Sequence, residues 1–364
     1  MNCTKNQFLK FKHIKSNLIY GKENITSTPL ISIAIPTYNR PLLLKEAIES
    51  ALNQKDFSNY EVIVVDNNPD STVEEEVIKS FNNSRLFYYK NESNLGMTGN
   101  WNRCIELAKG KWVTILHDDD LLYPDFLREM SEIIRNNDNI DLLTCIAEVG
   151  DHPHSLKKNV LKKIKGEIKE RIGIRKITLD RLLRSNINPF PGVLFKKDLA
   201  LKLGGFDETF YPCADYAFWF KYCLKNQGFI LYKTLSFYRI SVNESQSMNT
   251  KLGIIEKTYQ IQQTVMNNMH LNKLVKKMFT FISIGGLLYG YSARDKVFKE
   301  SEKLKEIEKK IKISKLYKTK FLRRILVRFF IVVTKFYFIC TGKNRTNIEE
   351  IYKDFNDFST TTNA

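Results

Sequence analysis

Short apolar runs alternate with stretches of helical spacing through the first 150 residues, and this alternation limits the possible folds most strongly. The apolar runs have the length of strands and span residues 31–35, 60–65, 86–89, 112–116 and 142–149. Between them, residues 41–52 and 100–108 place apolar side chains at helical intervals. Strands and helices that alternate in this way predict βαβ units, right-handed crossovers and a mostly parallel sheet. The predicted fold class is therefore α/β.

Polar side chains follow three of these strands directly. They occupy residues 37–40, 66–68 and 118–120. Open parallel sheets bind their ligands beyond the carboxyl ends of the strands. We therefore expect the three segments to converge at one edge of the sheet and to form the functional site there.

Asp118, Asp119 and Asp120 are the strongest single chemical signal. Three consecutive carboxylates repel one another unless a cation neutralises them, and their oxygen atoms suit Mg²⁺ or Mn²⁺ shared with the phosphates of a ligand. The alternative is an acidic turn that caps the next helix. Because the chain contains neither GxGxxG nor GxxxxGK[ST], the expected nucleotide would be bound without a glycine-rich loop.

The length and the cysteine pattern narrow the class of protein further. With 364 residues and 43% hydrophobic content, the chain is long enough for one large domain or two, and it is not a disordered protein. Its six cysteines form no CxxC pair, which argues against a disulfide framework or a thiolate zinc site. Lysines interrupt the first twenty residues, so we expect no cleavable secretory signal.

The net charge of +17 is concentrated in two segments. Residues 309–348 contain twelve basic residues and no acidic one, and residues 157–176 contain nine basic residues and two acidic ones. The remainder of the chain is nearly neutral. The basic charge is therefore a property of these two segments and not of the body of the fold.

Residues 315–340 have the pattern of a basic amphipathic helix, with Lys and Arg on one arc and Leu, Ile, Val and Phe on much of the remainder. Such a helix is expected to lie on an anionic membrane surface, since its uncharged apolar runs are too short to span a bilayer. The alternative is a helix that packs against the catalytic domain. Nucleic-acid binding is the competing class for a basic chain, and we expect none because no nucleic-acid-binding motif is present.

Six segments in order over about residues 29–245 carry a family resemblance. They are ISIAIPTYNR (31–40), VIVVDN (62–67), NLG (94–96), GKWVTILHDDDLLYP (110–124), GGFDE (204–208) and DY (215–216). Together they resemble the inverting glycosyltransferases of family 2, which have the GT-A fold, and in particular those of bacterial surface-polysaccharide synthesis.

The resemblance implies a nucleotide-sugar donor, most often a UDP-sugar. The residues that it assigns to donor binding are Thr37, Tyr38, Arg40, Asp66, Asn94, Gly96 and Asp118. The metal, Mg²⁺ or Mn²⁺, would be held by Asp119 and Asp120. His117 stands where the family commonly has an Asp, so either His117 replaces that ligand or Asp118 and Asp120 are the working pair.

Asp215 matches the catalytic base of the family, in a motif where Ala214 stands in place of the usual Glu. The alternative for Asp215 is a first-turn residue that the helix dipole favours. Two further residues are possible contributors. Arg239 lies where the family closes its site over the diphosphate, and Trp219 is either an acceptor platform or a core residue, of which the core is the more expected.

The predicted organisation has three parts: an N-terminal extension (residues 1–28), a GT-A catalytic domain (29–249) and a helical C-terminal region (250–364). The predicted function is sugar transfer with inversion to a lipid-linked or polysaccharide acceptor, as in O-antigen or capsule synthesis. The predicted location is cytoplasmic, peripheral on the inner face of the cell membrane. The alternatives are a catalytically silent subunit that binds nucleotide sugar or glycan, and a nucleic-acid-binding protein.

Overall fold

The computed structural model describes residues 6–21, 28–153, 173–186, 191–240, 246–269, 271–341 and residue 354. The chain forms two compact units. The first comprises Met1–Ile177, Asn188–Asp207 and Asn226–Asn243, and the second comprises Thr178–Ile187, Glu208–Lys225 and Glu244–Ala364. Most of the predicted basic segment at 157–176 lies outside the described residues. The functional boundaries proposed after residues 28 and 249 stay predictions.

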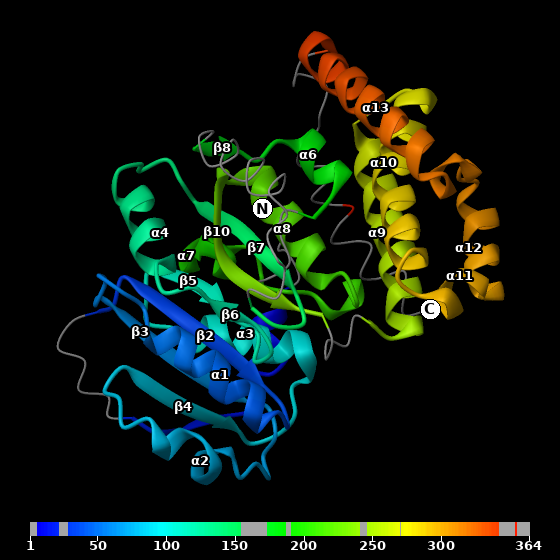
Figure 1. Ribbon diagram of the computed structural model, residues 1–364. Helices are drawn as coiled ribbons and strands as arrows, with labels where there is room; N and C mark the ends of the chain where they lie inside the picture. The colour runs from blue at the N-terminus through cyan, green and yellow to red at the C-terminus, as the bar shows by residue number, and fades with distance from the viewer. Residues whose placement is uncertain are drawn as a thin grey trace. The chain divides into compact units, whose positions relative to one another are not determined.

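The first unit is built on one mixed sheet, which has ten strands among the described residues (Figure 1). The strands are β1 (Ser16–Tyr20), β2 (Ile31–Thr37), β3 (Tyr60–Asp66), β4 (Leu86–Asn91), β5 (Trp112–Ile115), β6 (Leu121–Leu122), β7 (Leu142–Gly150), β8 (Ile174–Lys176), β9 (Val193–Lys196) and β10 (Gly228–Arg239). Their order is β1-β4-β3-β2-β5-β9-β7-β10-β6, and β8 pairs with β10.

The centre of the sheet is parallel, as the sequence predicts. β4, β3, β2 and β5 pair in parallel, so their carboxyl ends meet at one edge. The apolar stretch at 193–195 forms β9, which runs antiparallel between β5 and β7. The sheet therefore confirms the α/β class and is mixed on the side of β9.

Helices cover this sheet. They are η1 (Gln7–Leu9), α1 (Pro41–Leu52), α2 (Val73–Glu76), η2 (Ile78–Ser80), α3 (Gly96–Leu107), α4 (Phe126–Arg135) and α7 (Lys197–Lys202). The buried apolar residues of α1 and α4, such as Ile48 and Leu127, share one core cluster with residues of β2 and β3. α1 begins at Pro41, whose fixed φ suits the first turn and ends the preceding polar loop. The core thus fixes where that loop leaves the sheet.

The N-terminal extension is part of the first unit. β1 pairs antiparallel with β4, and the backbone N–H of Gln7 donates to the carbonyl of Gly204 at 2.9 Å. The buried guanidinium of Arg103 in α3 donates to the carbonyl oxygens of Phe11 and Ile14 at 2.9 Å and to Ser16 Oγ at 2.8 Å. The extension therefore covers the edge of β4 and is tied to α3, a structure that the sequence pattern did not indicate.

The second unit is helical, which confirms the predicted helical C-terminal region. Its helices are α6 (Leu179–Arg184), η3 (Glu208–Phe210), α8 (Ala214–Lys225), α9 (Met248–Asn268), α10 (Lys273–Ser292), α11 (Lys296–Glu300), α12 (Glu302–Ile311), η5 (Lys315–Lys318) and α13 (Lys320–Thr341). A core of buried apolar residues from α9, α10, α11 and α12 holds it together, with Ile255, Ile284 and Phe298 fully buried. Across the described part of the chain, every helix falls short of the length or apolarity needed to cross a bilayer.

Candidate functional site

The loops after β2 and β5 meet through direct polar contacts. Thr37, the last residue of β2, donates its Oγ1 hydrogen to Asp118 Oδ2 at 2.8 Å. Arg40 Nη1 lies 3.0 Å from Asp119 Oδ2 and 3.4 Å from Asp118 Oδ1. Two of the three predicted polar segments are therefore joined at the carboxyl edge of the parallel strands.

A second arginine contacts the loop of Asp118, Asp119 and Asp120, called the acidic loop below. Arg239, the last residue of β10, donates its backbone N–H to Asp120 Oδ1 and its Nε–H to the carbonyl of Asp119, both at 2.9 Å. Its Nη2 donates to Glu46 Oε2 in α1 at 2.5 Å. Because these contacts leave its side chain only 7% exposed, Arg239 acts as a support of the acidic loop.

Burial dominates the electrostatics of this loop. It raises the pKa of Asp118 to about 6, and Asp119 adds to that shift while the hydrogen bond from Thr37 and the charge of Arg40 oppose it. Burial and the charge of Asp119 also raise the pKa of Asp120. The two arginines therefore do not fully compensate the three carboxylates, and the loop favours an additional cation.

The donor atoms of the loop fit a divalent cation. His117, Asp119 and Asp120 each offer one ligand atom, and these atoms lie within 4.8 Å of one another. Asp120 Oδ2 is buried and accepts no hydrogen bond from the described residues, while Nδ1 of His117 lies 4.0 Å from it. Burial lowers the pKa of His117 and so keeps its imidazole neutral, the form that binds metals. Two carboxylates and one imidazole suit Mn²⁺ and accept Mg²⁺.

The imidazole of His117 is held by stacking. Its ring lies on Trp101 of α3, with 5.3 Å between the ring centroids and 19° between the planes. Trp101 itself meets Phe206 edge-on at 5.4 Å. Trp101 of α3 therefore orients His117, the residue that stands where the resembled family commonly has an Asp.

Asp66 is the last residue of β3 and belongs to the third predicted polar segment. This fully buried carboxylate accepts hydrogen bonds from the Tyr88 hydroxyl and from the backbone N–H of Asn68, both at 2.9 Å. Burial first, and then the charge of Asp66, raise the pKa of Tyr88, so its hydroxyl stays a donor. Asn68 Nδ2 also donates at 2.7 Å to Oδ1 of Asn39, which has a φ of 56°. The loops after β2 and β3 are thereby tied together beside Tyr38, whose side chain is exposed.

A network of asparagines shapes the loop that enters α3. Asn94 Oδ1 accepts from the backbone N–H of Gly96 and from Asn67 Nδ2, both at 2.8 Å. Asn67 Oδ1 in turn accepts from the backbone N–H of Leu95 and from Asn91 Nδ2. Gly96 has a φ of 71°, a conformation that costs glycine little. The sequence segments indicated Asn67, Asn94 and Gly96, whereas Asn91 was missed; an asparagine at the end of β4 was the available signal.

Asp215 lies in the second unit, in the first turn of α8. Asn186 Nδ2 donates to Asp215 Oδ2 at 2.8 Å. Burial raises the pKa of Asp215 to about 6, and the backbone N–H of Tyr216 and the amide of Asn186 limit that rise. Asn186 is a partner that no sequence motif indicated. Trp219, one turn further along α8, is fully buried and contacts Phe218 edge-on, which favours its core-packing alternative.

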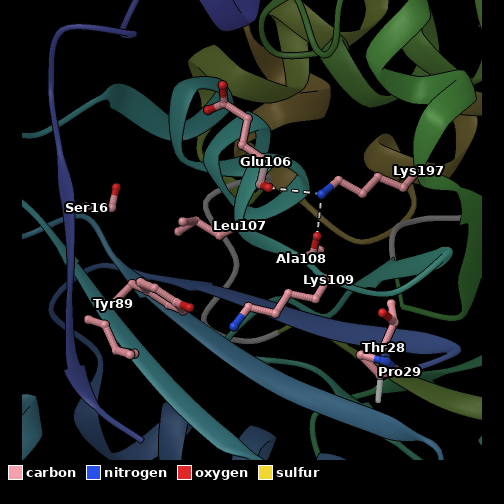
Figure 2. A pocket seen from close by; sticks show the side chains of 10 residues that line it. Ser16, Thr28, Pro29, Tyr89, Glu106, Leu107, Ala108, Lys109 and Lys197 are labelled. Atoms are coloured by element: carbon pink, nitrogen blue, oxygen red, sulfur yellow. Dashed lines mark hydrogen bonds between the residues drawn. The ribbon is translucent and has the colours of Figure 1, made fainter. Parts of the chain in front are cut away.

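A cavity of about 730 Å³ is lined by residues of β1, by Tyr89 of β4, by the end of α3 and by Thr28 and Pro29 before β2. Figure 2 shows Lys197 reaching into its wall, where its Nζ donates to the carbonyl oxygens of Glu106 and Ala108. Burial lowers the pKa of Lys197. Because its ammonium already serves backbone carbonyls, this cavity is less suited to a charged ligand than the acidic loop at the carboxyl edge.

Solved structures show which fold this architecture has. The chain aligns with the crystal structure of S. aureus TarS 1–349 in complex with UDP at a TM-score of 0.52 and 17% identity, over 84% of this chain and 90% of that one. The mixed sheet with its helical C-terminal region is therefore the GT-A fold of glycosyltransferases.

Sequence relatives place the chain more narrowly. The model of the family named glycosyl transferase family 2 matches residues 32–201. An uncharacterized glycosyltransferase of Methanocaldococcus jannaschii is 31% identical over 248 residues, which are 66% of this chain and 81% of the relative. A protein of Escherichia coli named as a colanic acid biosynthesis glycosyl transferase is 35% identical over 140 residues, covering 36% of this chain and 48% of that protein. This chain belongs to glycosyltransferase family 2.

Proposed function

We propose that this glycosyltransferase moves one sugar, with inversion, from a nucleotide-sugar donor to a hydroxyl group of a glycan acceptor. The observation that carries the proposal is the junction of Thr37 and Arg40 with the buried carboxylates of Asp118 and Asp119. A UDP-sugar is the simplest donor, in keeping with the UDP bound by TarS.

The donor would bind across the carboxyl ends of the parallel strands. In this proposal Asp66, Asn94 and Gly96 lie near the base and ribose, and the exposed ring of Tyr38 is available to stack on the base. Arg40, whose side chain is 35% exposed, presents its guanidinium to the diphosphate.

Asp119 and Asp120 would hold the divalent cation, with His117 as a further ligand. When bound, the cation stabilises the negative charge that develops on the departing nucleoside diphosphate. Arg239 would contribute by holding Asp119 and Asp120 in place, and Thr37 by orienting Asp118.

Asp215 is the proposed general base. Its carboxylate takes the proton of the acceptor hydroxyl as that oxygen forms a bond to the anomeric carbon. The bond from this carbon to the donor diphosphate breaks on the opposite face, and its electron pair leaves with the diphosphate. With a pKa of about 6, Asp215 is ionised at neutral pH and still basic enough for this step.

A lipid-linked or polysaccharide precursor is the proposed acceptor, in keeping with the relative named for colanic acid biosynthesis. Such an acceptor would place the enzyme peripherally at the cytoplasmic face of the inner membrane. Residues 29–249 would contain the catalytic residues, and residues 250–364 would attach the enzyme to the membrane.

The proposal is tested by thermal shift with nucleoside diphosphates and their sugars, with and without Mn²⁺, followed by mass spectrometry of donor hydrolysis. We expect one nucleotide to raise Tm only when metal is present, since ligands that bind the native state stabilise it. Asp119→Ala serves as the control and should lose the metal-dependent part of the shift. Stabilisation that is equal in wild type and Asp119→Ala, or independent of metal, would contradict the assigned site.

A further inference from the structure

An apolar stripe runs along the outer face of α13. Its members are large side chains between 50% and 71% exposed, namely Phe321, Ile325, Phe329, Val332 and Phe336. At the helical interval of about 100° per residue, all five fall within an arc of about 80°. Exposed apolar side chains gathered in this way on one helix face mark an interaction surface.

The other face of α13 is packed within the second unit. The ring of Phe330 meets Phe281 of α10 edge-on at 5.6 Å, and Leu326 and Val327 pack against the same core cluster. Thr334, one turn after Phe330, is fully buried. The helix is therefore held by its inner face, and the apolar stripe remains outside the core that α13 helps to form.

Basic residues lie along one side of the stripe. Arg324, Arg328 and Lys335 are exposed and fall within about 60° of its edge on the helical projection. Arg323 is not part of this row, because its guanidinium packs over the ring of Tyr289, 4.3 Å from the ring centroid. Residues 309–348 contain no acidic side chain that would neutralise this row.

We propose that the apolar stripe and basic row of α13 form a membrane-binding face, which inserts flat into the headgroup region of a bilayer rich in anionic phospholipids. The apolar side chains would enter the acyl boundary while the basic row contacts lipid phosphates. A second copy of the chain fits less well, because pairing through the stripe would bring two basic rows together without acidic partners. This proposal rests on the peripheral location proposed above. Vesicle binding is measured without donor, so that the membrane-binding proposal and the proposed sugar transfer can fail separately.

The first test is co-sedimentation of the full chain with vesicles of phosphatidylcholine, alone or mixed with phosphatidylglycerol. Binding is expected only to the mixed vesicles. The variant Phe321→Ser, Phe329→Ser, Phe336→Ser should bind at least ~100-fold more weakly, because three large side chains no longer leave water. The matched control Leu274→Ser, Val297→Ser changes two side chains that are equally exposed in α10 and α11 and should bind as wild type. Equal loss in both variants would overturn the proposal.

The second test addresses the basic row. Arg324→Gln, Arg328→Gln and Lys335→Gln should each weaken binding about fivefold and reduce its dependence on salt. Lys296→Gln, Lys303→Gln and Lys309→Gln remove the same charge from exposed positions in α11 and α12 and should have a smaller effect. Effects of the same size in both sets would indicate attraction by net charge alone and would contradict a defined binding face.

The third test measures insertion directly. In Phe329→Trp, brominated lipids should quench the new indole, whereas the indole of Leu274→Trp should not be quenched.

Sedimentation velocity without lipid decides against a second copy if wild type and the triple Phe→Ser variant are both monomeric. A wild-type dimer that this variant dissociates would overturn the membrane proposal, whatever the donor assays show.

Discussion

Asp120 accepts a hydrogen bond at 2.9 Å from the backbone N–H of Arg239, a residue 119 positions further along the chain. The bond joins the loop after β5 to the end of β10 and commits only one carboxylate oxygen, Oδ1, to the protein frame. The second oxygen, Oδ2, is buried and accepts no hydrogen bond from any described residue. The frame therefore orients Asp120 and leaves one of its oxygens for a cation.

Asp120→Asn should separate stability from metal binding. Without metal, the variant should unfold at a higher temperature than wild type, because one of several repelling buried charges is removed. With Mn²⁺ the difference in unfolding temperature between the variant and wild type should shrink or change sign, since the amide is a weaker ligand than the carboxylate. Thermal unfolding in the presence of chelator or Mn²⁺ measures both effects, and an unchanged metal-induced rise in Tm would argue against Asp120 as a ligand.

Asp215→Asn should retain donor binding and lose turnover. The amide keeps the size of the side chain but cannot accept the proton of the acceptor hydroxyl, so we expect kcat to fall by ~10²-fold or more. Binding of UDP by calorimetry and sugar transfer by mass spectrometry give the two readouts. Turnover near the wild-type value would exclude Asp215 as the base.

The pH dependence of kcat should show an acid limb near pH 6. Burial raises the pKa of Asp215 to about 6, so below that pH the base is protonated and activity falls. The amide of Asn186 stabilises the ionised carboxylate, and its removal in Asn186→Ala should raise that pKa and move the limb to higher pH. A limb that keeps its position while kcat drops would indicate a purely structural role for Asn186.

Arg103→Ala should loosen the N-terminal extension. The buried guanidinium contacts three acceptors between Phe11 and Ser16, and hydrogen bonds to charged groups stabilise by about 1.5–3 kcal/mol each, so we expect a loss of ~2–4 kcal/mol after partial solvation. Urea unfolding and limited proteolysis before residue 21 measure the change. Arg128→Ala removes an exposed arginine with surface ion pairs and should cost at most ~1 kcal/mol.

Periodicity and composition were sufficient to predict the centre of the fold. Strands that are buried on both faces give continuous apolar runs, which is why β2 and β3 begin where the sequence predicts, at Ile31 and Tyr60. The convergence of Thr37, Arg40 and Asp118 follows from strand direction alone once the sheet is parallel. For these elements local pattern and tertiary structure agree.

Elements that depend on distant partners were not predictable in the same way. β1 is short and partly polar, and it is a strand because β4 offers an open edge. Between β3 and β4 the chain forms two short helices, α2 and η2, and Ser71 Oγ accepts a hydrogen bond from the backbone N–H of Val73. Asn186 reaches Asp215 from a segment 29 positions away, and no local pattern encodes such a pair.

The antiparallel strand β1 has a practical consequence for anyone who trims this enzyme. The family model begins at residue 32, so a truncation guided by it would remove residues 16–20 and leave the backbone donors and acceptors of β4 open to solvent. An unprotected, largely apolar strand of this kind recruits other chains. We expect such a shortened protein to precipitate or self-associate during expression, and protein that begins at Met1 to remain dispersed.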